Sequence, residues 1–313
     1  MRISSNIKII NSANYATAAN WNALFPFGKH GNVTTVGTNG GPSAYGTFDQ
    51  SGNVEEWIGE FSGPGDAIFR GGNFNLGAED ISKYGRPFED ASGFHESRGY
   101  RVATFNNPLS IANFLTVGNA GNANDSTGYG GVNYQYQIGK YPVTNYDYKV
   151  FLNAVAAVDS YGLFQPIMSS SPSCGITRSG TSGSYMYSTR DNMHAKPVNC
   201  VSWFSAARYC NWLHNNYGDT ETGAYELNGV TLGNIPEKNL NARYWIPTEN
   251  EWYKAAYYTP NKNGSGPGYW AYATQSDTPP MAVTANSVGD GRIPPNAISP
   301  KVQKINNAFK IRM

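Results

Sequence analysis

Helical periodicity is confined to three short segments of this 313-residue chain, all in its second half or close to its middle. The spacing of apolar residues predicts helices over 144–157, 202–214 and 248–258. The expected N-caps are Thr144 or Asn145, Ser202, and Thr248 in a capping box with Glu251. The first hundred residues carry almost no helical signal. This asymmetry predicts an α+β fold with many irregular loops, and it argues against an α/β repeat.

The rest of the chain consists of short strand candidates between clusters of Gly, Asn, Ser and Pro. Strands are expected over 67–70, 100–103 and 132–138. The 35 glycines disfavour a long all-helical fold. Aromatic residues are as frequent as charged ones, at 14% each, which excludes a disordered chain. Such a composition is more typical of extracellular, particle or surface proteins than of cytosolic enzymes.

Charge and hydropathy narrow the choice of partners. Lys and Arg number 23 and Asp and Glu number 22, so the formal net charge is +1. No strong field is available to attract nucleic acid or an anionic membrane. No window approaches the roughly 18 apolar residues of a membrane span. The N-terminus also lacks the apolar stretch of a signal peptide. Only the composition therefore favours an extracellular or particle-associated location.

The chain has three cysteines, Cys174, Cys200 and Cys210. This number is too small for a disulfide framework, and the spacing of Cys200 and Cys210 matches no usual zinc motif. Cys210 is expected to be a buried small hydrophobe. A disulfide between two of the three stays open if the protein is exported.

Five phrases of the sequence together carry a family resemblance. They are 198–213 (VNCVSWFSAARYCNWL), 245–256 (WIPTENEWYKAA), 45–57 (YGTFDQSGNVEEW), 70–74 (RGGNF) and 98–103 (RGYRVA). This set closely resembles the formylglycine-generating enzyme / sulfatase-modifying-factor domain, a variant of the C-type-lectin fold. The resemblance covers roughly 11–105 and 110–290, and it implies a loop-rich α+β domain.

The order of the phrases differs from that of the family. Residues 1–105 resemble the C-terminal half of the family domain, and 106–290 resemble its N-terminal half. We therefore expect one circularly permuted domain over 1–313, with 291–313 as an extra tail. The break lies near 289–291, in a loop of the kind where permutation is tolerated. The alternative is two unrelated half-domains, but nothing in the chain is duplicated.

The chain departs from the family at the residues that the family's enzymatic chemistry requires. Formylglycine-generating members hold copper with a cysteine pair shortly after the "RGG.F" phrase, and Cu(I) requires such soft thiolates. Here Leu76 and Ile81 stand at those positions. The chain has only four histidines, which form no iron-binding cluster. The adjacent Glu55 and Glu56 suggest no paired-carboxylate site, because their side chains should diverge.

A calcium site is expected where Asp49, Gly52, Val54 and Glu56 surround a tight turn. Ca²⁺ takes carboxylate and carbonyl oxygens, and the family has a structural calcium at this motif. A second family site would use Asn14 with the carbonyl of the next residue, but no clear Asp follows within 16–36.

The resemblance also places an exposed ligand surface in the loops over 73–97. Its candidate residues are Asn75, Lys83, Tyr84, Arg86 and His95. Their polar and aromatic character suits recognition of a glycan or a protein, and equally suits an ordinary solvated loop. Both chain ends, 3–10 and 308–313, read as short strands. They could pair with each other or add to a neighbouring copy, giving rings or filaments.

The sequence thus favours a non-enzymatic, calcium-stabilised, lectin-like structural or binding protein that self-assembles through its termini or through swapped halves. Two alternatives stay open. One is an enzyme of the sulfatase-modifying-factor class with altered chemistry, and the other is a soluble sugar- or protein-binding receptor.

Overall fold

The computed structural model describes residues 11–21, 30–107, 109 and 113–292. The helices in these ranges are α1 (Asn145–Val155), α2 (Ile167–Ser170), α3 (Trp203–His214) and α4 (Glu249–Tyr257). The strands are β1 (Ser12–Ala13), β2 (Glu55–Gly63), β3 (Asp66–Arg70), β4 (Phe88–Asp90), β5 (Arg98–Gly99), β6 (Ala103–Thr104), β7 (Phe114–Val117), β8 (Tyr136–Gly139), β9 (Ile176–Ser179), β10 (Met186–Thr189), β11 (Tyr258–Thr259), β12 (Gly268–Tyr269), β13 (Met281–Ala282), β14 (Thr284–Ala285) and β15 (Gly291–Arg292). The strands expected at the two chain ends lie outside the described residues.

The three predicted helices are confirmed, and each begins directly after its predicted capping residue. Thr144 caps α1, Ser202 caps α3 and Thr248 caps α4. In α4 the capping box is complete, because the Glu251 carboxylate accepts a hydrogen bond from the Thr248 backbone N–H at 2.8 Å. The short α2 carries no periodicity and was not expected. These helices are few and the strands short, as an α+β, loop-rich fold requires.

Short strands form one four-stranded sheet, one three-stranded sheet and several two-stranded pairs. The larger sheet has the order β4-β3-β2-β5, and β3 confirms the strand predicted over 67–70. The strand predicted over 132–138 is shorter, because β8 begins only at Tyr136. The prediction over 100–103 was largely wrong. The Tyr100 and Val102 carbonyls accept hydrogen bonds from Val143 and Gly139, which belong to other segments, so no continuous ladder forms.

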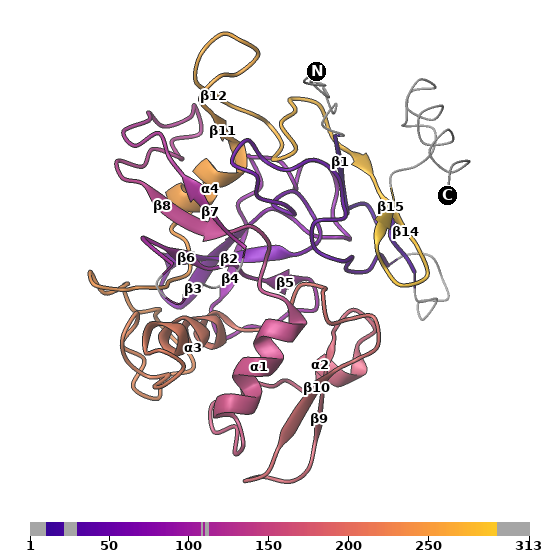
Figure 1. Cartoon of the computed structure of the whole chain (residues 1–313), viewed down its shortest axis with the longest axis vertical. Coiled ribbons are helices and arrows are strands. Elements are labelled where there is room, and N and C mark those ends of the chain that lie inside the picture. Colours follow the sequence, from indigo (N-terminus) through magenta and orange to yellow (C-terminus); the bar gives the residue numbers. More distant parts are fainter. Residues whose placement is uncertain (1–10, 22–29, 108, 110–112, 293–313) are drawn as a thin grey trace, which may run out of the picture.

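Residues from both halves of the chain share one hydrophobic core. Figure 1 shows the strands β2 to β6 of the first half between α4 on one side and α1 and α3 on the other. One tryptophan from each half donates a hydrogen bond to a backbone carbonyl of the other half. The Trp57 indole N–H donates to the Val201 carbonyl, and the Trp203 indole N–H donates to the Ile58 carbonyl, both at 2.9 Å.

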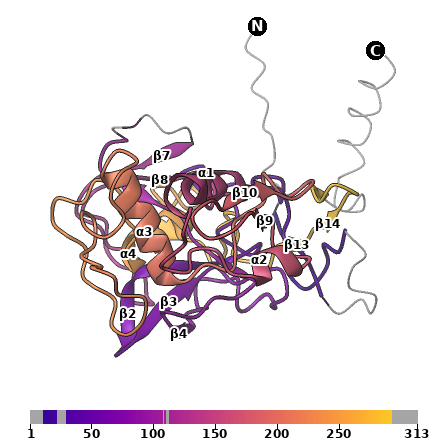
Figure 2. The ribbon, with the colours of Figure 1, turned by 90° about the horizontal axis from the view of Figure 1, so that it is seen from below.

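Strand pairing also crosses between the halves. β6 pairs with β8 in antiparallel fashion, and β1 pairs with β13 in parallel. Figure 2 shows β2, β3 and β4 at the edge of the molecule opposite β7. None of the helices in the described part of the chain has the length and apolar character needed to cross a membrane.

Candidate functional site: a cleft beside β2 and β5

The start of β2 sends two adjacent glutamates in opposite directions, because successive side chains of a strand alternate between its faces. The Glu56 carboxylate is fully buried and accepts hydrogen bonds from Arg101 Nε at 2.5 Å and Arg101 Nη2 at 2.6 Å. It also accepts the Trp252 indole N–H at 2.8 Å. The expected divergence of the two side chains is confirmed. Glu56 belongs to the interior, where it joins the strand to α4.

Glu55 faces a cleft and meets a different arginine. Its carboxylate lies 3.7 Å from Arg98 Nη2, which is only 2.8 Å from the carboxylate of Glu89. The Arg98 guanidinium also stacks on the Phe69 ring, with 3.7 Å between its central carbon and the ring centroid. Arg98 Nε and Nη1 are buried and have no hydrogen-bond partner among the described residues. Arg98 is therefore held by packing as much as by its two acids.

Burial changes the acidity of the carboxyl at the floor of this cleft. Desolvation raises the pKa of Glu55 to about 7, although the nearby Arg98 opposes that rise. Glu55 can therefore gain or lose a proton near neutral pH. A carboxyl with such a shifted pKa in a cleft is a candidate for binding or proton transfer.

The cleft itself has a volume of about 550 Å³. It is lined by side chains that include Glu55, Leu76, Asp80, Arg86, Glu89, His95 and Arg98. Three acids and two arginines thus surround one hollow. The carboxylates of such a surface can accept hydrogen bonds from the hydroxyl or amide groups of a ligand, and its guanidinium groups can donate to them.

The structure divides the predicted ligand surface between two hollows. Arg86 and His95 line the cleft described above, whereas Lys83 and Tyr84 line a neighbouring hollow of about 600 Å³. Asn75 is half-buried, and its side-chain oxygen accepts a hydrogen bond from the Gly31 backbone N–H at 2.8 Å. The structure thus places two of these residues at one hollow, two at another, and Asn75 against Gly31.

Two of these predicted ligand residues also hold the loop in place. Arg86 forms two hydrogen bonds with the Glu249 carboxylate, at 2.8 and 3.0 Å, and Arg70 pairs with the same carboxylate. Lys83 pairs with Asp125 at 2.8 Å. Both contacts join the 73–97 loops to the second half of the chain. The exposed Tyr84 and His95 are freer to meet a ligand.

Sequence reasoning missed Glu55, Glu89 and Arg98 as a group. The adjacent glutamates were a visible signal, because a charged pair at a strand start sends one side chain toward each face. Nothing in the sequence indicated that Arg98 would reach Glu55, since the two lie in different strands. The parallel register of β2 and β5, in which Glu55 faces Arg98, brings them together.

The resemblance assigns Leu76 and Ile81 to the positions of the family's copper ligands. Leu76 lines the cleft, and Ile81 is fully buried in a small apolar cluster with Ala13 and Tyr272. The three cysteines of the chain are buried in the second half. The described residues contain no group of three or more His, Cys, Asp or Glu that could hold a metal ion.

The predicted calcium site has oxygen ligands that are partly engaged. Asp49 is buried and accepts hydrogen bonds from the Gly37 backbone N–H at 2.7 Å and from the Asn39 amide at 2.6 Å. Burial raises its pKa to about 6. A carboxylate has about four lone-pair sites. Asp49 therefore keeps acceptor capacity for a cation, and Glu56, with three N–H donors, keeps less.

The turn between these two acids is tight and leaves no room for a side chain at Gly52. Gly52 has a φ of 86°, and an added Cβ would lie 2.2 Å from the Asn14 carbonyl oxygen. The side-chain oxygen of Asn14 is buried and has no partner among the described residues. An oxygen without a donor is the kind of group that a cation or a water satisfies. Carboxylate, amide and backbone carbonyl oxygens, the donor types of Asp49, Asn14, Gly52, Val54 and Glu56, are those that a hard cation takes.

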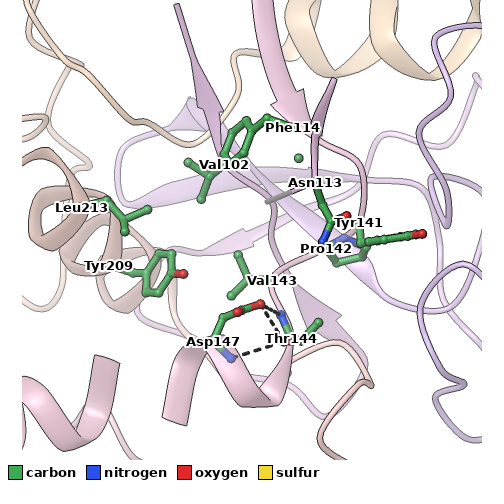
Figure 3. A pocket seen from close by; sticks show the side chains of 11 residues that line it. Val102, Asn113, Phe114, Tyr141, Pro142, Val143, Thr144, Asp147, Tyr209 and Leu213 are labelled. Carbon is green, nitrogen blue, oxygen red and sulfur yellow. Dashed lines mark hydrogen bonds between the residues drawn. The ribbon is translucent and has the colours of Figure 1, made fainter. Parts of the chain in front are cut away.

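A separate hollow of about 240 Å³ lies at the start of α1 (Figure 3). Its polar groups there are Thr144 and Asp147, which already bond each other in the helix cap, as the dashed lines show. The other lining side chains are mainly apolar and aromatic, among them Val102, Tyr209 and Leu213. The lining also includes the polar side chains of Asn113 and Tyr141, but the two groups at the helix start already bond each other, so we assign no function to this hollow.

Comparison with known proteins gave one result. The family model of the sulfatase-modifying factor enzyme 1-like domain matches residues 127–298, which is more than half of the chain. Comparison with curated proteins and with solved structures gave no significant match.

Proposed function

Since this chain belongs to the sulfatase-modifying factor enzyme 1-like domain family, we propose that it is a non-enzymatic, calcium-stabilised binding protein. Its ligand face is the cleft floored by Glu55 and Arg98. The ligand is a polar group of a glycan or of a protein. Ca²⁺ at Asp49, Gly52, Val54 and Glu56 holds the turn that leads into β2, and so fixes the floor of the cleft.

The observation that carries this proposal is the chemistry of the cleft. Copper oxidation of a thiol requires thiolate ligands, whereas Leu76 and the buried Ile81 offer none. In their place the cleft presents carboxylates and guanidinium groups, which bind hydroxyl and amide groups through charge-assisted hydrogen bonds.

A glycan array, probed with the full chain in Ca²⁺ and again in EDTA, tests the binding function. We expect binding of defined glycans that His95→Ala and Asp80→Ala weaken and that EDTA reduces. Tyr217→Ala is the matched control, because Tyr217 is an exposed aromatic outside the cleft. Binding that all three variants retain equally would place the ligand elsewhere.

A second function, an enzyme with altered chemistry, is favoured by one observation. The raised pKa of Glu55 suits a general acid or base. The copper chemistry of the family is tested directly by mass spectrometry of a Cys-x-Pro-x-Arg peptide incubated with the protein, copper and oxygen. We expect no loss of the thiol above a control without protein. Clear conversion would overturn the non-enzymatic proposal.

We propose further that the domain is a circularly permuted, C-type-lectin-like one. The contacts at the expected break support this. Asp290 accepts a hydrogen bond from Thr35 at 2.6 Å, and Lys196 donates to the same Thr35 hydroxyl at 2.7 Å. The end of the second half thus lies against the first. A single unfolding transition seen by both fluorescence and circular dichroism is expected. A fragment over 106–313 that folds with full stability would contradict it.

Self-association through the termini or through exchanged halves is part of the same proposal. The low net charge of +1 leaves little repulsion between copies. Light scattering of the full chain with calcium should then show oligomers, and deletion of 1–10 or of 302–313 should give monomers. A monomer at high concentration would leave the receptor alternative.

A further inference from the structure

Two cysteines from different segments meet in the interior. The Sγ atoms of Cys174 and Cys200 are 2.6 Å apart, and both residues are fully buried. That separation is only about half an ångström longer than a disulfide bond of about 2.05 Å. Cys210, in α3, makes no such contact among the described residues.

The backbone holds both cysteines in place. Cys200 has a φ of 61°, a left-handed conformation that residues other than Gly rarely adopt. Its N–H donates to the His95 carbonyl at 3.0 Å. The Cys174 carbonyl accepts a hydrogen bond from Arg190 at 2.8 Å. The contact between the two sulfurs therefore does not depend on a freely moving loop.

The same two segments support the loop that lines the cleft. The Asn199 amide donates to the carbonyls of Ser173, at 2.8 Å, and of Glu96. The Ser171 hydroxyl donates to the Glu96 carboxylate. The loop over 95–98, which carries His95 and Arg98, thus rests on the 171–174 segment and on 199–200 together.

We propose that Cys174 and Cys200 form a disulfide that fastens these two segments beneath the 95–98 loop of the cleft. The oxidant is a small-molecule disulfide of the glutathione class. One cysteine thiolate attacks its S–S bond and releases one glutathione thiolate. The second cysteine thiolate attacks the resulting mixed disulfide and releases the other. Two protein thiols are oxidised and the glutathione disulfide is reduced to two thiols. The two protons lost by the protein thiols end on the two released glutathione thiolates.

The surroundings of the pair determine when this reaction happens. The hydrogen bond with Cys174, together with burial, raises the pKa of the Cys200 thiol. Because the thiolate is the reactive form, the folded interior suppresses exchange. The bond therefore forms while the chain folds or opens, and it then resists reduction in the native state. Burial also raises the pKa of Cys210, which remains a thiol.

Thiol counting on the full chain tests the proposal. The protein is refolded with reduced and oxidised glutathione or with dithiothreitol. It is then denatured and alkylated with iodoacetamide, and its mass is measured by mass spectrometry. We expect one alkylated cysteine after the glutathione treatment and three after dithiothreitol. Peptide mapping should join Cys174 to Cys200. The reduced protein should melt roughly 5–10 °C lower than the oxidised one. Hydrogen exchange at 95–98 should be faster in the reduced protein.

Variants make the count specific. Cys210→Ser should leave no alkylated cysteine after oxidative refolding, whereas Cys174→Ser and Cys200→Ser should each leave two. If the latter two fail to fold, the Cys210→Ser count decides alone, because two alkylated cysteines in it would overturn the proposal. Three alkylated cysteines in the oxidatively refolded full chain, or a mapped bond to Cys210, would also overturn it. This test is independent of the ligand proposed for the cleft.

Discussion

Glu55 and Glu56 are neighbours at the start of β2, yet each meets a different arginine in a different environment. Glu56 and Arg101 are both fully buried and form two short hydrogen bonds, at 2.5 and 2.6 Å. Glu55 lies 3.7 Å from Arg98, and Arg98 is shared with the half-exposed Glu89. Glu56 accepts three N–H donors from the protein itself. The pair of Glu55 with Arg98 leaves hydrogen-bonding capacity unused and opens onto a cleft.

This contrast shows how one strand can separate stability from binding. Buried ionic groups that satisfy one another are costly to break, because the remaining charge is left without a partner. Groups that are only partly satisfied are available to a ligand or to a proton. The alternation of β2 places one acid of each kind on its two faces.

The largest expected effect follows from breaking the buried pair of Glu56 with Arg101. Glu56→Gln should lower the free energy of unfolding by about 3–5 kcal/mol, because Arg101 is then left charged and unpaired in the interior. Urea unfolding at pH 7 measures this, with Glu55→Gln as the matched neighbour. A loss of under about 1 kcal/mol for Glu56→Gln would contradict the structural role assigned to the pair.

The next effect is the pH dependence that comes from Glu55. Its pKa is raised from 4.5 to about 7 on folding. The folded protein therefore keeps a proton over a range where the unfolded chain has lost it, and stability falls as pH rises through that range. The loss from Glu55 is about 3 kcal/mol.

Urea unfolding at several pH values between 4 and 8 checks this prediction. Glu55→Gln should remove roughly half of the slope and leave the part from Asp49, whose pKa is raised from 3.8 to about 6. A wild-type stability that is constant or rises over this pH range would contradict the prediction.

Calcium provides the third test. Binding to the folded state alone should add about 2.7 kcal/mol when free Ca²⁺ is a hundred times its dissociation constant. The melting temperature should therefore rise with Ca²⁺ and fall with EDTA. Asp49→Asn should abolish this response while leaving the pair of Glu56 with Arg101 in place. A melting temperature that EDTA leaves unchanged in both proteins would rule out the calcium site.

The smallest effect concerns the outer partner of Arg98. The Glu89 side chain is 51% exposed, and ion pairs of this kind contribute only about 0.2–1 kcal/mol. Glu89→Gln should thus change the free energy of unfolding by less than about 1 kcal/mol in urea. The change should be smaller still at high salt, because salt screens the ion pair. A larger loss would show that Glu89, and not stacking on Phe69, holds Arg98 in the cleft.

Local sequence determined the helices and their starts. Thr144, Ser202 and Thr248 cap α1, α3 and α4 through groups only three residues away, so a short window contains all the information. The divergence of Glu55 and Glu56 is equally local, because it follows from the pleat of a single strand. The family resemblance, carried by short phrases, was confirmed by the match over 127–298.

Only the tertiary structure decided which distant groups meet. Glu249 binds Arg70 and Arg86, which precede it by more than 160 residues. Tyr100 and Val102 do not form the predicted strand, and their carbonyls accept hydrogen bonds from residues 43 and 37 positions further along the chain. Cys174 and Cys200 came together in the same way. Local preference cannot specify such contacts, since they depend on how the loops between them close and on what each buried polar group finds as a partner.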